Sequence, residues 1–164
     1  SQISDGASAV VLTARSHADE QGWPVLAVLG ASGQVAGPDN SLHAQPARAI
    51  QAALDREGLD ASALDFVEIN EAFGAVVAHS AAELGLGPEQ VNLHGGGIAI
   101  GHPIGASGNR LVVHAVHELV RRHSCGCTLR RWRPGRCSDL ASVSPVAVLA
   151  SGTPAIDSAR GRYR

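Results

Sequence analysis

The spacing of hydrophobic residues changes along the chain, and the changes predict alternating strands and helices. Four short apolar runs are rich in strand-forming residues or follow turn signals, which is typical of strands. Two longer segments space their apolar residues in the helical manner, and a third has a helix-forming composition. Alternation of this kind predicts an α/β arrangement of layers. The predicted strands cover residues 7–13, 25–29, 64–69 and 91–93, and the predicted helices cover residues 46–57, 72–84 and 111–122.

The ends of the predicted helices carry signals of their own. Pro46 suits the first turn of a helix, where its missing N–H is not needed. Gly58 and Gly85 follow the first two helices as stop signals, and Arg122 places a cation at the end of the third. A stretch rich in Gly, Ser, Pro and Asn over residues 30–40 predicts a loop before the first helix.

Composition limits the class of protein. The chain has 164 residues, of which 45% are hydrophobic, 17% are charged and 3% are aromatic. These values are typical of one soluble globular domain and argue against disorder. The sequence shows no apolar run long enough for a membrane span and no basic segment followed by an apolar core at its start. The expected location is therefore the cytoplasm.

Charge divides the chain near residue 124. Residues 1–123 carry 6 arginines against 13 acidic residues, whereas residues 124–164 carry 7 arginines against 2 acidic residues. All 3 cysteines also lie in the second part, and the chain has no lysine. The formal net charge of −2 hides this break, which requires an explanation.

Glycine is concentrated in one segment. Residues 95–108 contain 6 glycines and a single histidine, His102, which precedes Pro103. Glycine raises the entropic cost of folding and adds no side-chain packing, so the backbone here must turn sharply or approach another group closely. Neither a Walker loop nor the dinucleotide-binding spacing is present. From the residues alone, His102 is either a structural histidine in a tight loop or a functional one.

A second candidate site follows the predicted strand 64–69. Asn70 and Glu71 stand at the corner between this strand and the next helix. An amide at a strand end can hold a water molecule or donate to an oxyanion. It can equally cap the following helix. The residues alone leave both interpretations open.

Two blocks of residues together resemble the thiolase family. The first is residues 70–73, Asn-Glu-Ala-Phe, and the second is residues 92–108, Asn-Leu-His-Gly-Gly-Gly-Ile-Ala-Ile-Gly-His-Pro-Ile-Gly-Ala-Ser-Gly. Residues 1–6, Ser-Gln-Ile-Ser-Asp-Gly, also look like the segment that leads into the last strand of the family's N-terminal domain. The resemblance covers residues 1–123, which is less than half of a family chain.

The resemblance implies a fold. It is the C-terminal half of the thiolase fold, an α/β fold layered α/β/α/β/α, and it is incomplete here. Residues 1–15 would end the N-terminal domain with its last strand, residues 24–123 would form the C-terminal domain, and residues 124–164 would be an irregular, out-of-frame tail. Such a piece leaves apolar faces uncovered, so we expect poor solubility or dependence on a partner chain.

The resemblance also implies a chemistry. Thiolases make or cleave the carbon–carbon bond of a 3-ketoacyl-CoA through an acyl-cysteine intermediate. His102 matches the histidine that ionises the thiol, a task that suits an imidazole because it titrates near neutrality. Asn70 matches the residue that holds the water of an oxyanion hole shared with this histidine. Ser1, Phe73 and Gly101 would bind CoA.

Partners follow from the same resemblance. Coenzyme A and acyl-CoA are expected as substrates, with no resident cofactor and no metal. Neither nucleic acid nor a membrane is expected as a partner. Family members associate as homo-oligomers, and a complementary N-terminal half is the other expected partner of this chain.

The family nucleophile lies in the N-terminal half, and no cysteine of this chain matches it. We therefore expect the isolated chain to be inactive, although its family is one of acyl-CoA acyltransferases. The alternative function is that of a non-catalytic truncated remnant or a binding fragment. A separate chain or upstream frame that carries a cysteine nucleophile would favour the enzyme.

A shifted reading frame explains the tail. In the family a Cys-x-Gly motif follows the last helix, and residues 125–140 lack this motif. Permitted codons for these residues, read one base later, encode Ala-Ala-Ala-Leu-Cys-Gly-Gly-Gly-Gly-Gln-Gly-Asp-Ala-Leu-Ile, which resembles the thiolase ending. We therefore hypothesise a frameshift near residue 124, which also accounts for the charge break and the clustered cysteines.

Two other interpretations of the tail are weaker. A metal site through His123, Cys125, Cys127 and Cys137 would need a Cys-x-Cys spacing that departs from the usual structural zinc pattern. A nucleic-acid interface is disfavoured because few aromatic residues interleave with the arginines and no known module is present.

Sequencing the gene tests the frameshift. We expect that one inserted or deleted base near codon 124 restores the Cys-x-Gly ending. If no single-base change restores it, the hypothesis is wrong. Zinc analysis of the purified chain tests the metal alternative, which requires bound zinc.

Overall fold

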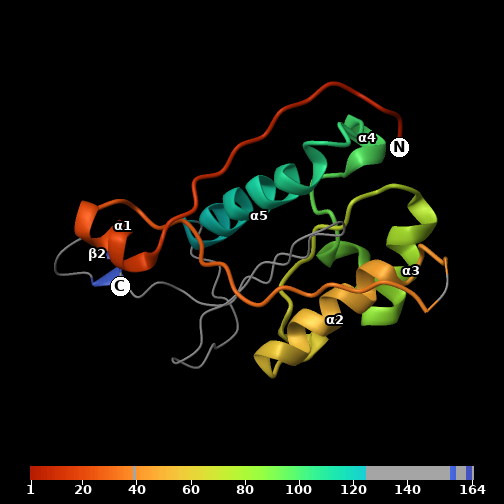
Figure 1. Cartoon of the computed structure of the whole chain (residues 1–164), viewed down its shortest axis with the longest axis horizontal. Coiled ribbons are helices and arrows are strands. Elements are labelled where there is room, and N and C mark those ends of the chain that lie inside the picture. Colours follow the sequence, from red (N-terminus) through yellow and green to blue (C-terminus); the bar gives the residue numbers. More distant parts are fainter. Residues whose placement is uncertain (39, 125–155, 158–161, 164) are drawn as a thin grey trace.

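A computed structural model describes residues 1–38, 40–124, 156–157 and 162–163 of the chain (Figure 1). The cysteines of the tail lie outside these residues, and so does nearly all of the segment assigned to a shifted frame. Strands β1 (Ile156–Asp157) and β2 (Arg162–Tyr163) pair antiparallel, with Ile156 opposite Tyr163. The elements are α1 (Arg15–Gln21), α2 (Gln45–Glu57), α3 (Gly74–Leu84), α4 (Gly97–Ile100), α5 (Ser107–Ser124), β1 (Ile156–Asp157) and β2 (Arg162–Tyr163), with 3-10 turns at Ala61–Ala63 and Pro88–Gln90.

The three predicted helices are confirmed as α2, α3 and α5. Pro46 lies in the first turn of α2. Gly58 and Gly85 close α2 and α3 with φ angles of 65° and 68°, a left-handed conformation that glycine adopts without steric cost. The sequence pattern does not predict α1, because only Ala18 of this short polar helix is buried. In the part of the chain that the structure describes, no helix is long and apolar enough to cross a membrane.

Two predicted strands, residues 64–69 and 91–93, run side by side in parallel. Their pairing is limited to one bridge. The backbone N–H of Val67 donates to the carbonyl of Gln90 over 2.7 Å, and the N–H of Asn92 donates to the carbonyl of Val67 over 2.9 Å. These segments form the extended layer of the described fold.

The two other predicted strands, residues 7–13 and 25–29, are wrong for the described chain. Neither run is assigned to a strand or a helix. A strand depends on backbone hydrogen bonds to a neighbour, and β-propensity alone does not supply one. The apolar side chains of the first run are accordingly uncovered, with Val11 87% and Leu12 66% exposed.

From Phe66 to Ile69 the apolar side chains of the first segment divide between two hydrophobic clusters according to the two-residue period of a strand. Phe66 packs with Leu111 and Ala115 of α5. Val67 and Ile69 belong to the other cluster, which includes residues of α2 and α3. Full burial of Phe66 stabilises the fold by roughly 2–3 kcal/mol. The extended layer therefore lies between α5 and the pair α2 and α3 (Figure 1).

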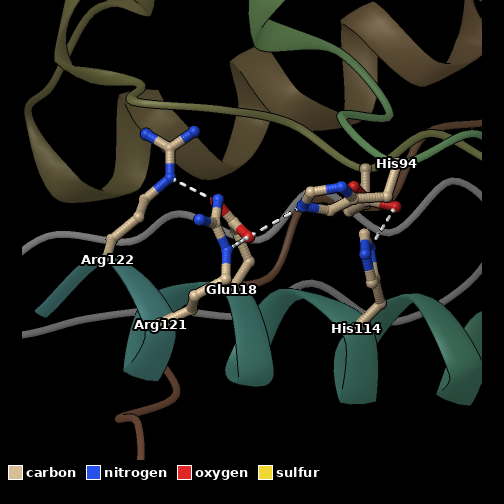
Figure 2. Close-up of polar contacts among 6 residues, drawn as sticks. His94, His114, Glu118, Arg121 and Arg122 are labelled. Atoms are coloured by element: carbon tan, nitrogen blue, oxygen red, sulfur yellow. Dashed lines mark hydrogen bonds and ion pairs between the residues drawn. The ribbon is translucent and has the colours of Figure 1, made fainter. Parts of the chain in front are cut away.

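Charged side chains gather on the inner side of α5 around Glu118 (Figure 2). The buried carboxylate of Glu118 accepts hydrogen bonds from Arg121 over 2.7 and 2.8 Å and from Arg122 over 2.6 Å. Nε2 of His94 lies 3.0 Å from its Oε2 on the other side. The hydrogen bonds, led by those from Arg121, lower the pKa of Glu118 to about 2.

Glu68 is the second buried carboxylate of this region. Its Oε2 lies 3.0 Å from Nδ1 of His114, and its side chain is fully buried. Burial raises the pKa of Glu68, while His114, Arg110 and His94 act in the opposite direction. Glu118 and Glu68 therefore give stability contributions with opposite pH dependence.

Replacing Glu118 tests the cluster. The folded pKa of about 2 lies below the ordinary value of 4.5, so the contribution is complete above about pH 4.5 and is lost as the pH falls toward 2. We expect Glu118→Gln to lower the free energy of unfolding by roughly 1–3 kcal/mol at pH 7. The difference in the free energy of unfolding between the variant and the native chain should be smaller at pH 3 than at pH 7. Urea unfolding at both pH values measures this difference.

The matched control is Glu83→Gln. Glu83 lies on α3, is 44% exposed and stands 3.6 Å from His79. Its replacement should change stability little at either pH, because exposed pairs contribute little. The native chain and both variants contain Glu68, so its titration contributes equally to the three free energies of unfolding and cancels in their differences. If Glu118→Gln lowers the free energy of unfolding by the same amount at pH 7 and pH 3, the stabilising role given to the ionised Glu118 is wrong.

Candidate active site

The glycine-rich segment forms two sharp turns around the short helix α4. Gly95 and Gly101 have φ angles of 85° and 91°, in the region that favours glycine. Two features of Gly101 exclude a side chain. One is its positive φ angle, and the other is that an added Cβ would lie 2.4 Å from Oγ of Ser4. At Gly101 the absence of a side chain therefore allows the backbone to pack closely against the start of the chain.

The side chain of Asn92 joins the two sequence blocks. Its Oδ1 accepts the backbone N–H of Ile69 over 2.7 Å, and its Nδ2 donates to the carbonyl of Ile69 over 3.0 Å. Nδ2 also donates to Oε1 of Glu71 over 3.0 Å. Asn92 itself adopts a φ of 48°, which asparagine tolerates better than most residues. One amide thus fixes the end of the extended layer.

Glu71 continues this link to α4. Its Oε2 accepts the backbone N–H of Ile98 over 2.8 Å. A Cβ at Gly96 would lie 2.5 Å from the carboxylate carbon of Glu71, so only glycine leaves room for this carboxylate. The block at residues 70–73 therefore packs directly on the glycine-rich segment.

His102 is held at its backbone and at its ring. Its backbone N–H donates to the carbonyl of Gln2 over 2.8 Å, next to a parallel bridge between Ile3 and His102. Its Nδ1 lies 2.5 Å from Oγ of Ser107, a buried residue that begins α5. The imidazole is therefore anchored between the start of the chain and the first turn of α5.

The structure excludes one of the two interpretations of Asn70, that of a helix cap. The N-cap of α3 is Phe73, with no side-chain cap bond, so Asn70 does not cap this helix. Asn70 is 9% exposed, and its Oδ1 has no hydrogen-bond partner among the described residues. A buried unpaired oxygen of this kind costs roughly 1–3 kcal/mol, so it requires an explanation.

The remaining predicted site residues lie around the same segment. The backbone nitrogen of Ser1 donates to the carbonyl of Ala72 over 3.2 Å, and its side chain lies against Gly97. The start of the chain lies beside α4 in Figure 1, as these contacts require. Phe73 follows Ala72 and is 63% exposed. Among the described residues, the hydrogen bonds that connect the neighbourhoods of Asn70 and His102 run through Glu71 and the first residues of the chain.

An open groove adjoins His102. It has a volume of about 430 Å³ and is lined by residues 4–8 on one side and residues 103–106 on the other. Asn109 ties the two sides together, because its Nδ2 donates to Oγ of Ser8 over 2.8 Å. Most of its lining residues are Gly, Ala or Ser, and the larger ones are Asp5, Pro103 and Ile104.

Sequence reasoning gave no role to Glu71, Asn92 or Ser107. Each lies within one of the two blocks quoted above, and each is a polar residue beside glycines or a strand end. This position in the sequence is the signal that could have identified them as functional residues. Their hydrogen bonds hold residues 70–73 and His102 in place. In the described residues, no group of three or more His, Cys, Asp or Glu side chains is arranged to hold a metal ion.

Comparison with known proteins identifies the family. Residues 23–129 match the family described as thiolase, C-terminal domain. The chain therefore belongs to the thiolase family, and its fold class is the C-terminal part of the α/β thiolase fold. Among solved structures, the Bacillus anthracis acetyl-CoA acetyltransferase aligns with a TM-score of 0.61 at 38% identity, covering 66% of this chain and 28% of that chain.

Two relatives show how much of the family chain is present. The "Probable acetyl-CoA acetyltransferase" of Mycobacterium tuberculosis is 57% identical over 124 residues, which are 76% of this chain and 32% of that protein. The human peroxisomal 3-ketoacyl-CoA thiolase is 46% identical over 122 residues, which are 74% of this chain and 29% of that protein. The chain thus spans about a third of the length of these relatives.

Asn92→Ala tests the amide that joins the two blocks. The substitution leaves the N–H and the carbonyl of buried Ile69 unpaired, so we expect a loss of roughly 2–4 kcal/mol in the free energy of unfolding. The amide of Ile69 should also exchange with solvent faster. Urea unfolding and hydrogen exchange measure the two effects.

Asn109→Ala is the control, since it removes one hydrogen bond to the side chain of Ser8. Its expected cost is below about 1 kcal/mol. Unchanged exchange at Ile69 in Asn92→Ala, together with a stability equal to that of the control, would contradict the role given to Asn92.

Proposed function

We propose that this chain supplies the general base and part of the CoA site of a thiolase, an enzyme that transfers acyl groups to or from coenzyme A. The proposal rests on His102, whose backbone and ring are both held by hydrogen bonds next to an open groove. An imidazole is well suited to take a proton from a thiol near neutral pH. The names of the bacterial and human relatives support the class of reaction.

The proposed reaction begins with a cysteine thiol supplied by another part of the enzyme. His102 takes the thiol proton, and the thiolate attacks the ketone carbon of a 3-ketoacyl-CoA. The carbon–carbon bond breaks, the departing enolate is protonated to acetyl-CoA, and the acyl group remains on the cysteine. The thiol of a second CoA then takes up the acyl group, and the reverse sequence makes the carbon–carbon bond.

Asn70 is proposed to act on the oxygen that becomes negative in this reaction. Its burial, its unpaired Oδ1 and the absence of a capping role support a place for it in an oxyanion hole. A water molecule held by Asn70 would satisfy the amide oxygen and present its proton to a thioester oxygen together with His102. Stabilisation of this type acts mainly on the transition state.

Ser1, Phe73 and Gly101 are proposed to bind the CoA arm. Ser1 and Phe73 lie beside α4, and Phe73 is 63% exposed, which favours an apolar contact with a ligand. Gly101 brings the backbone close to the start of the chain without a side chain in between. The adjoining groove offers a path for an extended pantetheine chain.

A chimera tests the proposal. In the Mycobacterium tuberculosis relative, the 124 shared residues are replaced by those of this chain. We expect the chimera to cleave acetoacetyl-CoA with CoA, and we expect His102→Ala in the chimera to reduce the rate roughly 10²- to 10⁴-fold because the base is lost. The assay follows the disappearance of acetoacetyl-CoA. The isolated chain should give no turnover, because it brings no matching nucleophile.

His79→Ala in the chimera is the matched control. His79 lies on α3, is 54% exposed and is outside the proposed site, so its loss should leave the rate unchanged. A folded chimera without turnover would favour the non-catalytic remnant. Turnover that survives His102→Ala would remove His102 as the base.

A further inference from the structure

Ser107 is a buried polar residue that the proposed reaction does not use. It is 3% exposed and stands at the first position of α5. Its Oγ makes two polar contacts, one with Nδ1 of His102 at 2.5 Å and one with the carbonyl of Pro103 at 3.1 Å. A hydroxyl has one proton to donate, so the two contacts constrain each other.

Counting hydrogen bonds decides where the protons lie. The carbonyl of Pro103 can only accept, and bonding of a serine to the carbonyl four residues earlier is a common pattern in helices. If the hydroxyl donates to Pro103, its oxygen is free to accept from an Nδ1–H of His102, and both contacts are hydrogen bonds. If the hydroxyl donates to Nδ1 instead, the contact with Pro103 has no proton and only one bond remains.

The surroundings favour the arrangement with two bonds. The carbonyl of Pro103 also accepts the backbone N–H groups of Ala106 over 2.8 Å and of Ser107 over 2.9 Å, so it keeps partners in both arrangements. The difference lies at the hydroxyl of Ser107, which is buried and gains a second hydrogen bond only when it accepts from an Nδ1–H. The backbone of His102 is fixed by its bond to Gln2, which keeps the ring within reach of Ser107 at the start of α5.

We infer that Ser107 is a positioning residue that holds neutral His102 in the Nδ1–H tautomer. In a neutral imidazole only one nitrogen carries a proton, so Nε2 keeps the lone pair. This is the reverse of the Nε2–H form that free histidine favours in water. The tautomer is a property of this chain, and its consequence for catalysis rests on the proposed function: Nε2 becomes the atom that takes the thiol proton.

NMR of the full chain labelled with ¹⁵N tests the inference without an activity assay. Long-range ¹H–¹⁵N correlations at a pH where the ring is neutral distinguish a protonated from an unprotonated imidazole nitrogen. Comparison with His102→Gln assigns the signals of His102 among the 8 histidines. We expect Nδ1 to be protonated and Nε2 unprotonated. A predominant Nε2–H form in the native chain overturns the inference.

Two substitutions test the part played by Ser107. Ser107→Ala removes the acceptor, so we expect His102 to move to the Nε2–H form or to an average of both forms. Ser107→Thr keeps a hydroxyl and should keep the Nδ1–H form. The native result alone remains decisive if either variant fails to fold. A folded Ser107→Ala chain that retains the native tautomer overturns the inference.

Ser80→Ala is the matched control. Ser80 is a buried helical serine on α3, and its Oγ donates to the carbonyl of His43 over 2.8 Å. Its loss should leave the His102 signals unchanged. If the native chain has the expected tautomer but the chimera is inactive, the proposed function fails while the assignment of the tautomer is supported.

Discussion

The side-chain amide of Asn92 is the contact on which the arrangement of the site depends. It pairs with both backbone groups of Ile69, as a neighbouring strand would, and it also holds Glu71. The two segments of the extended layer pair through one bridge. The amide of Asn92 therefore supplies hydrogen bonds to the backbone that a longer strand ladder would otherwise supply. It fixes the position at which Asn70 leaves the layer, and through Glu71 it fixes α4.

Helix α5 links the core to the histidine. Its inner side packs on Phe66 and carries the cluster around Glu118, while its first residue, Ser107, contacts His102. Loss of one partner of a buried ion pair is strongly destabilising, because it leaves the other charge buried and unpaired. The cluster therefore restricts the position of α5 against the extended layer. The same helix therefore joins hydrophobic packing, buried charge and the orientation of an imidazole.

Prediction from sequence succeeded where the cause is local. The limits of α2 and the end of α3 follow from Pro46, Gly58 and Gly85, whose backbone preferences act within a single turn. It failed for residues 7–13 and 25–29, because a strand needs a partner from elsewhere. The ambiguity at Asn70 was of the same kind. Only the position of the N-cap at Phe73 could exclude a capping role.

The sequence by itself determined the family, the helices and the blocks in which the site residues lie, because motif spacing, helical periodicity and turn residues are written along one stretch of chain. The tertiary structure alone decided which polar groups meet: Asn92 with Ile69, Glu71 with Ile98, and Ser107 with His102. The reason is that hydrogen bonds depend on distances of a few ångströms. Packing sets such distances between segments that are far apart in sequence.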